Sequence, residues 1–328
     1  MSKTTLKKLA VVLLIIAAII SSFFLTSTVN ATSIVSNEKR KVTPDIEVDD
    51  IVPLSIEEEK IMEYDATTGI TREVNMNELK QSLNTRKGGY SDRIESYDPL
   101  AEDIPSNTIT PHAIYNPVPN VTDLPYRATC RIKADVYGEE LVASGYVAGP
   151  KIVVTAAHCV MNQKDNDAYF ADWVAYPGYN NGSSYKGVSS GWAKVYYSSG
   201  WTSTHSTAYD WCICILNSDI GNTTGWLGTQ SYGSNSEMNG LSVRLLGYPL
   251  SVGDGECQYY TSGTISNTRD LYFESSARSV GGFSGGPVAR TSDNYVVGVN
   301  HGYYKLNPET ETGARITQDM INIIRENM

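Results

Sequence analysis

The pattern of apolar and polar positions divides the chain into three parts. Residues 9–25 are apolar without a single charge, whereas residues 32–112 are mostly polar and acidic, with long stretches that lack regular apolar spacing. From residue 113 onward, short apolar runs rich in β-branched residues alternate with turns rich in Gly, Ser and Asn. This alternation predicts an all-β domain over 113–328. Its last stretch, 317–328, places apolar residues behind Thr317 and predicts a short C-terminal helix.

The N-terminal part predicts export. Three lysines precede the apolar run, and Val29-Asn30-Ala31 supplies small residues at a cleavage position, so residues 1–31 are predicted to be a signal peptide and the protein to be secreted. An uncleaved membrane anchor is the alternative. After signal cleavage no membrane partner is expected. Residues 32–112 are interpreted as a propeptide and linker, which makes the protein a zymogen, with a spacer or wall-associated tail as the alternative.

Composition excludes several classes of site. The chain has four histidines and five cysteines, without a CxxC or HExxH motif, so neither a metal site nor a cofactor is predicted. A net charge of −10 gives no basic patch for nucleic acid. The odd number of cysteines cannot all pair within one chain. The expected state is a monomer whose partners are protein or peptide substrates and its own propeptide.

One serine lies in an unusual glycine-rich turn. Ser284 is surrounded by four glycines in Gly281-Gly282-Phe283-Ser284-Gly285-Gly286-Pro287. Glycines allow a sharp turn and bring N–H groups close to an oxyanion, as acyl transfer requires. The motif also fits the G-x-S-x-G elbow of α/β-hydrolases. That class places its acid and its histidine after the serine, and it alternates strands with helices, so this reading is rejected.

A histidine and an acid complete a catalytic constellation. His158 follows a β-branched run in Ile152-Val153-Val154-Thr155-Ala156-Ala157-His158-Cys159, and Asp210 opens the apolar run 211–216. A carboxylate at such a position is costly to bury unless it is paired, and a histidine N–H is its natural partner. Asp219 and Asp172 are less well placed competitors. The order His158, Asp210, Ser284 predicts a serine-protease triad.

These motifs resemble the trypsin/chymotrypsin superfamily. Other stretches are similar to its bacterial glutamyl endopeptidase branch, namely Pro125-Tyr126-Arg127-Ala128, 191–201, 221–223, Gly247-Tyr248-Pro249 and 312–317. The resemblance implies two six-stranded antiparallel β-barrels, at about 125–220 and 235–316, with the active site between them. It also implies an oxyanion hole formed by the N–H groups of Gly282 and Ser284. The alternative function is a non-catalytic, protease-like binding protein, which predicts a damaged triad.

Two positions depart from the superfamily pattern. Phe283 replaces the Asp that often precedes the serine, so activation through an ion pair with that Asp is not expected. In the glutamyl branch the mature N-terminus contributes near the specificity pocket instead. The usual cysteine partner of Cys159 would fall near Ala143, and Cys130 and Cys257 remain alternative partners.

Specificity is predicted from four positions. By resemblance, Ser279 corresponds to a pocket-wall residue that receives an acidic side chain. The pocket histidine of the family aligns with Asn300, while His301 lies one residue later and would face the other way unless the register shifts. Arg278 falls at the pocket base, where a guanidinium can bind a carboxylate. The expected preference is therefore for Glu or Asp before the scissile bond.

Overall fold

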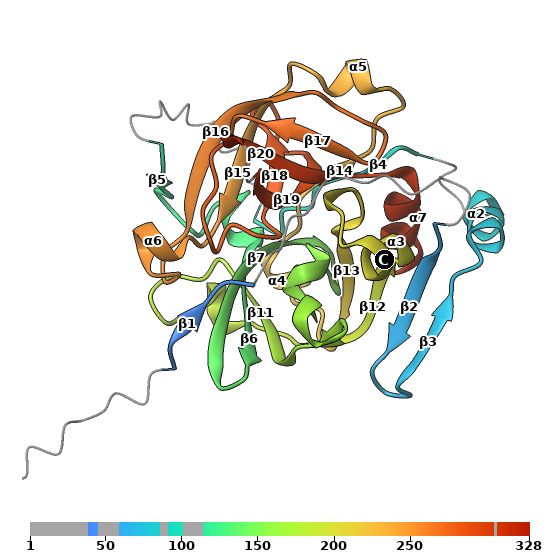
Figure 1. Cartoon of the computed structure of the whole chain (residues 1–328), viewed down its shortest axis with the longest axis horizontal. Coiled ribbons are helices and arrows are strands. Elements are labelled where there is room, and N and C mark those ends of the chain that lie inside the picture. Colours follow the sequence, from blue (N-terminus) through green and yellow to red (C-terminus); the bar gives the residue numbers. More distant parts are fainter. Residues whose placement is uncertain (1–38, 45–58, 86–90, 101–113, 305–306) are drawn as a thin grey trace, which may run out of the picture. The chain divides into compact units, whose positions relative to one another are not determined.

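The β-branched runs form strands that build two sheets (Figure 1). The computed structural model describes residues 39–44, 59–85, 91–100, 114–304 and 307–328, so the predicted signal peptide lies outside the described residues. The mostly β architecture confirms the predicted fold class. Among the described residues, no helix is both long and apolar enough to span a membrane.

The first sheet contains six strands from the predicted first barrel and three from the segment before it. Its order is β11 (Ala171–Pro177), β6 (Thr129–Val136), β7 (Glu139–Gly149), β8 (Ile152–Thr155), β13 (Cys212–Leu216), β12 (Trp192–Ser198), β2 (Ile61–Asp65) and β3 (Ile70–Glu73). A bridge between Ala175 and Ser190 joins the β11 end to the residues just before β12. A short parallel strand, β1 (Lys41–Val42), pairs with β7.

The second sheet closes on itself. Its order is β18 (Pro287–Arg290), β15 (Ser242–Gly247), β16 (Tyr259–Ser266), β17 (Tyr272–Ser275), β20 (Asn307–Arg315), β19 (Val296–Tyr304), β14 (Thr229–Gln230) and β4 (Arg93–Ile94). Because β18 also pairs with β19, six of these strands form a closed barrel. A further strand, β5 (Asn116–Pro117), pairs with β16.

Helices are short. They are α2 (Met76–Thr85), α3 (Ser199–Thr204), α4 (Gly221–Thr224), α5 (Asn235–Met238), α6 (Leu250–Gly253) and α7 (Gln318–Glu326). The predicted C-terminal helix is confirmed as α7, whose Thr317 cap accepts a hydrogen bond from the Met320 N–H at 3.3 Å. The apolar side chains of α7 are buried, which explains why this segment folds as a helix.

The described pieces of residues 32–112 pack on the two sheets. Strand β2 pairs with the edge strand β12 along five residues, and α2 packs against α7, where Lys80 and Asp319 form an ion pair of 2.9 Å. Pairing satisfies backbone groups that an open edge leaves unbonded. These pieces therefore obtain their order from the sheets that they cover.

The five cysteines, all in described residues, are free thiols. Cys159 is bonded to neither Cys130 nor Cys257. Cys212 and Cys214 are fully buried on β13, as expected for small core residues. Burial raises the pKa of these two thiols, so they stay protonated and unreactive.

Candidate active site

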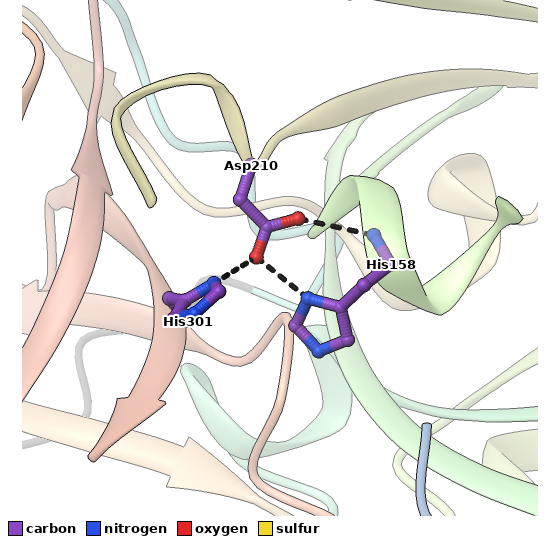
Figure 2. Close-up of side chains that lie close together, drawn as sticks. All are labelled: His158, Asp210 and His301. Carbon is purple, nitrogen blue, oxygen red and sulfur yellow. Dashed lines mark hydrogen bonds and ion pairs between the residues drawn. The ribbon is translucent and has the colours of Figure 1, made fainter. Parts of the chain in front are cut away.

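His158 and Asp210 lie at the ends of two neighbouring elements of the first sheet. His158 lies in the 3₁₀ turn Ala157–Cys159 that follows β8, and Asp210 ends the 3₁₀ turn Thr207–Tyr209 before β13. Strands β8 and β13 pair in antiparallel register, with Thr155 opposite Cys212, which brings the two side chains together. Asp210 accepts two hydrogen bonds from His158, one from its main-chain N–H at 3.0 Å and one at 2.6 Å from ring Nδ1 (Figure 2).

Asp210 is fully buried and stays ionised. Burial favours the neutral acid, but the two imidazoles of His158 and His301 and their hydrogen bonds outweigh it, so the pKa of Asp210 is lowered. Nδ1 of His301 lies 2.5 Å from Oδ2, the same oxygen that His158 Nδ1 contacts. A buried carboxylate held by ring N–H donors orients an imidazole and stabilises its charged form.

A metal ion does not fit between these three side chains as they stand. Two ligands of a tetrahedral zinc ion, each 2.0–2.1 Å from the metal, are about 3.3 Å apart. Asp210 Oδ2 lies only 2.6 Å and 2.5 Å from the two Nδ1 atoms. These are hydrogen-bond lengths, so the cluster is a proton-sharing arrangement.

The Ser284 turn is packed against the strand end that carries His158. Ser144 on β7 donates its N–H to the Ser284 carbonyl at 2.8 Å and its hydroxyl to the Gly282 carbonyl at 2.6 Å. Gly285 adopts a φ of +76°, and a Cβ there would lie 2.1 Å from Thr155 Oγ1. Only glycine permits so close an approach. Strand β7 and the glycine-rich sequence thus hold Ser284 beside the β8 end.

Three N–H groups of the turn, those of Gly281, Gly282 and Ser284, have no acceptor among the described residues. Phe283, Gly285 and Gly286 donate their N–H groups to main-chain carbonyls, whereas no described residue accepts from the N–H of Gly282 or Ser284. Gly282 has a φ of +102°, and a Cβ there would meet the Tyr248 carbonyl at 2.2 Å. The N–H groups of Gly282 and of the serine itself are therefore free to serve as the donor pair that the resemblance implies for an oxyanion hole.

The hydrogen bond between Ser284 and His158 that the predicted triad requires is not formed in this structure. His158 Nε2 is buried and has no partner among the described residues, including Ser284. Such bonds are often long or misaligned before substrate binds and tighten in the complex. The ring therefore offers a nitrogen that is available to accept a proton.

Three of the predicted pocket residues, Arg278, Ser279 and His301, act on a carboxylate that the sequence did not point to, that of Glu311. Ser279, which is buried, donates its hydroxyl in a short hydrogen bond to Glu311 on β20. Burial raises the pKa of Glu311, and the charges of Arg278 and His301 oppose that shift. The Tyr115 hydroxyl lies 3.5 Å from the Ser279 carbonyl, which brings the segment just after the predicted propeptide to this position.

Asn300 and His301 contact different groups, as strand alternation predicts, and the β19–β20 register is irregular just after Asn300. Asn300 pairs with Gly313 and Gly302 pairs with Thr312, so His301 is the additional residue of a bulge in the β19–β20 pairing. The Asn300 amide donates to the Phe283 carbonyl at 3.3 Å, while the His301 ring turns to Asp210. The structure thus brings His301 to the triad acid.

Sequence reasoning missed the contacts of Glu311, Ser144 and His301 with these positions. Glu311 lies among polar residues on β20, and Ser144 lies inside an apolar strand. Neither has a motif of its own. Only the Asn300-His301 pair drew notice in the sequence, because the strand register left open which of the two side chains faces the pocket.

Residues 143–299 match the family of trypsin-like peptidase domains. These residues belong to the trypsin-like peptidase family. The match spans both His158 and Ser284, and it confirms the family predicted from the motifs.

The protease domain is similar to two curated Bacillus proteins. An extracellular metalloprotease of Bacillus subtilis is 30% identical over 219 residues, which are 63% of this chain and 66% of that protein. A glutamyl endopeptidase of Bacillus licheniformis is 31% identical over 177 residues, which are 54% of this chain and 53% of that protein. The chain therefore spans just under two thirds of the first relative and about half of the second. The second relative supports the predicted glutamyl endopeptidase branch.

Solved structures share the fold of the protease domain. A Glu endopeptidase in complex with MPD has a TM-score of 0.56 at 22% identity, over 65% of this chain and 95% of that chain. Protease Anisep from Arthrobacter nicotinovorans has a TM-score of 0.54 at 24% identity, over 64% of this chain and 98% of that chain. The match includes nearly the whole length of both structures, so this chain has the chymotrypsin-like fold from one end of that domain to the other.

Proposed function

We propose that this protein is a secreted serine endopeptidase that is made as a zymogen and uses Ser284, His158 and Asp210 as its triad. The observation that carries the proposal is the position of Asp210. Its buried carboxylate binds both the main-chain N–H and ring Nδ1 of His158, while Nε2 keeps no partner among the described residues. That arrangement gives the imidazole one tautomer, with Nε2 as the proton acceptor.

The reaction follows from these atoms. Ser284 Oγ attacks the scissile carbonyl while His158 Nε2 takes its proton, and the N–H groups of Gly282 and Ser284 bind the oxyanion. The imidazolium then protonates the leaving amine, which releases the first product and leaves an acyl-enzyme. Water, activated by the same ring, hydrolyses the ester and restores Ser284. Asp210 orients His158 throughout and stabilises its charged form.

We further propose cleavage after Glu or Asp. The support is the half-buried Arg278 beside the Ser279–Glu311 pair, together with the activity named for the Bacillus licheniformis relative. A guanidinium can bind a substrate carboxylate in two parallel hydrogen bonds. Ser279 and Asn300 are assigned to the pocket on the same basis.

The segment before the protease domain is proposed to restrain it. Strand β1 lies beside β7, and its Lys41 ammonium forms an ion pair of 2.7 Å with Glu256. A Cβ on Gly281 would come within 2.6 Å of Thr43 Cγ2, so this segment contacts the turn that leads to Ser284. A segment that occupies this side of the turn competes with substrate until it is removed. Secretion rests on the sequence of residues 1–31.

The test is digestion of a peptide library by the processed protein, with Ser284→Ala as the matched control. Cuts that vanish in the Ser284→Ala protein and persist with a metal chelator support the serine mechanism. Cuts that persist in Ser284→Ala, or that the chelator abolishes, contradict it. Serine-dependent cuts after residues other than Glu and Asp keep the protease and reject the acidic preference. A correctly processed, folded sample that makes no cut favours the binding-protein alternative.

A further inference from the structure

Two histidines hold the Asp210 carboxylate, and one of them, His301, is not part of the proposed triad. His301 on β19 is buried to 1% exposure, and its Nδ1 lies 2.5 Å from Asp210 Oδ2. The rings of His158 and His301 meet edge to face at 80°, with centroids 5.4 Å apart. Figure 2 shows the carboxylate between the two imidazoles.

The backbone of β19 places the His301 ring against the Asp210 carboxylate. Alternation along the strand turns Asn300 toward the Ser284 turn and His301 toward Asp210, and His301 is the additional residue of the bulge opposite β20. Asp210 Oδ1 is occupied by the His158 main-chain N–H, so Oδ2 receives both ring donors. The three donors together define one orientation of the carboxylate.

We propose that His301 is a positioning residue: through its Nδ1–H it fixes the Asp210 carboxylate that orients His158. The inference rests on the proposed serine mechanism. Without His301, Oδ2 keeps one donor, and the side chain can rotate about its terminal bond, because the Asp terminal torsion is broad. Charged hydrogen bonds in such a buried site are roughly twice as strong as neutral ones. His301 also draws part of the negative charge of Asp210 away from His158.

The charged groups around His301 come from three elements. Asp210 lies before β13, His158 follows β8, and Glu311 lies on β20. The charge of Arg278 also acts on the Glu311 carboxyl group. His301 Nε2 and Glu311 Oε1 are both buried without a partner among the described residues. Any pH dependence of the His301 contact therefore includes the ionisation of Glu311, and Glu311→Gln is the control that removes it.

Two substitutions separate positioning from space filling. In His301→Asn the amide nitrogen falls where Nδ1 lies, so the donor to Asp210 is kept, whereas His301→Gln extends its amide past that position. We expect kcat/KM of the processed enzyme to fall about 10- to 100-fold in His301→Gln, the factor that corresponds to one charged hydrogen bond. His301→Asn should stay within a few-fold of wild type. KM should change little in either variant, because His301 is argued to act through Asp210.

The pH profile supplies a readout that a packing role would not move. Loss of the His301 donor concentrates the Asp210 charge on His158, so the acid limb of kcat/KM should shift to higher pH in His301→Gln and return in His301→Asn. Equal rates and equal acid limbs in the two variants overturn the inference. If Ser284→Ala keeps its activity, the proposed function fails instead. The two failures are therefore distinguishable.

A second measurement does not require a His301 variant to fold. In the Ser284→Ala protein, proton NMR should show two strongly downfield ring N–H signals, one from each imidazole bound to Asp210. A single signal that titrates with His158 alone overturns the inference.

Discussion

Replacement of Asp210 by Asn tests the central contact of the site. The carboxylate accepts from the His158 main-chain N–H at 3.0 Å and from two ring nitrogens at 2.6 Å and 2.5 Å. An amide has only one oxygen. If that oxygen meets the main-chain N–H, the NH₂ group faces the rings, and His158 Nδ1 must accept a hydrogen bond. The ring proton then moves to Nε2, which can no longer take the proton of Ser284.

The opposite amide orientation is also costly. It places the NH₂ group against the His158 main-chain N–H, and a buried donor without an acceptor costs about 1–3 kcal/mol. Neither orientation supplies the negative charge that stabilises the imidazolium. We therefore expect kcat to fall on the order of 10³- to 10⁴-fold, as for the loss of a triad carboxylate. At about 1.36 kcal/mol per tenfold, this is about 4–5.5 kcal/mol of transition-state stabilisation.

The assay is steady-state cleavage of a peptide substrate by the processed enzyme, with circular dichroism to confirm folding. Asp219→Asn is the matched control, because Asp219 is exposed and pairs with Asn222 in a turn. Its rate should equal that of wild type. An Asp210→Asn enzyme that keeps more than a tenth of wild-type kcat would refute the reasoning, and so would a large loss in the control.

Three further predictions follow from individual contacts. Gly282→Ala should lower kcat by about 100-fold or more, because the new Cβ would meet the Tyr248 carbonyl. Gly240→Ala is the control and should leave kcat unchanged, because Gly240 has a similar φ of +88° but open space around it. Lys41→Ala should raise the residual activity of the unprocessed protein about fivefold, equivalent to about 1 kcal/mol, and Lys41→Arg should not; equal activities would exclude the proposed restraint by β1. Because the folded-state pKa of Glu311 is raised, the free energy of unfolding should fall as pH rises from the ordinary Glu value through the folded-state pKa, and thermal melts of Glu311→Gln should lack this fall.

The proposed catalytic residues could be picked out from the sequence because each is carried by a local motif. The glycines around Ser284 are required by a turn with positive φ, and the apolar run before His158 is a strand with a fixed end. Thr317 and the apolar spacing behind it defined α7 for the same reason. Information of this kind lies within about ten residues, where periodicity and turn chemistry operate.

The remaining features depend on pairing between distant segments. The Ser279–Glu311 contact joins the residues before the Ser284 turn to β20, and the β2–β12 pairing joins the predicted propeptide to the first sheet. Neither has a local signal, because strand register is set by the whole sheet and a shift of one residue moves every side chain to the other face. The His301 bulge is such a shift confined to one position.

The contact of His301 with Asp210 also bears on how the proposed acidic pocket would bind a substrate carboxylate. Since His301 is hydrogen-bonded to Asp210, we assign recognition of a substrate carboxylate to Arg278, which acts electrostatically on Glu311. While Glu311 is protonated, it adds no negative charge beside Arg278, and the proposed pocket favours an acidic side chain. When Glu311 ionises, it neutralises Arg278 and repels the substrate carboxylate. The preference for Glu and Asp should therefore be strongest below the raised pKa of Glu311 and weaken above it, and Glu311→Gln should keep that preference across the whole range.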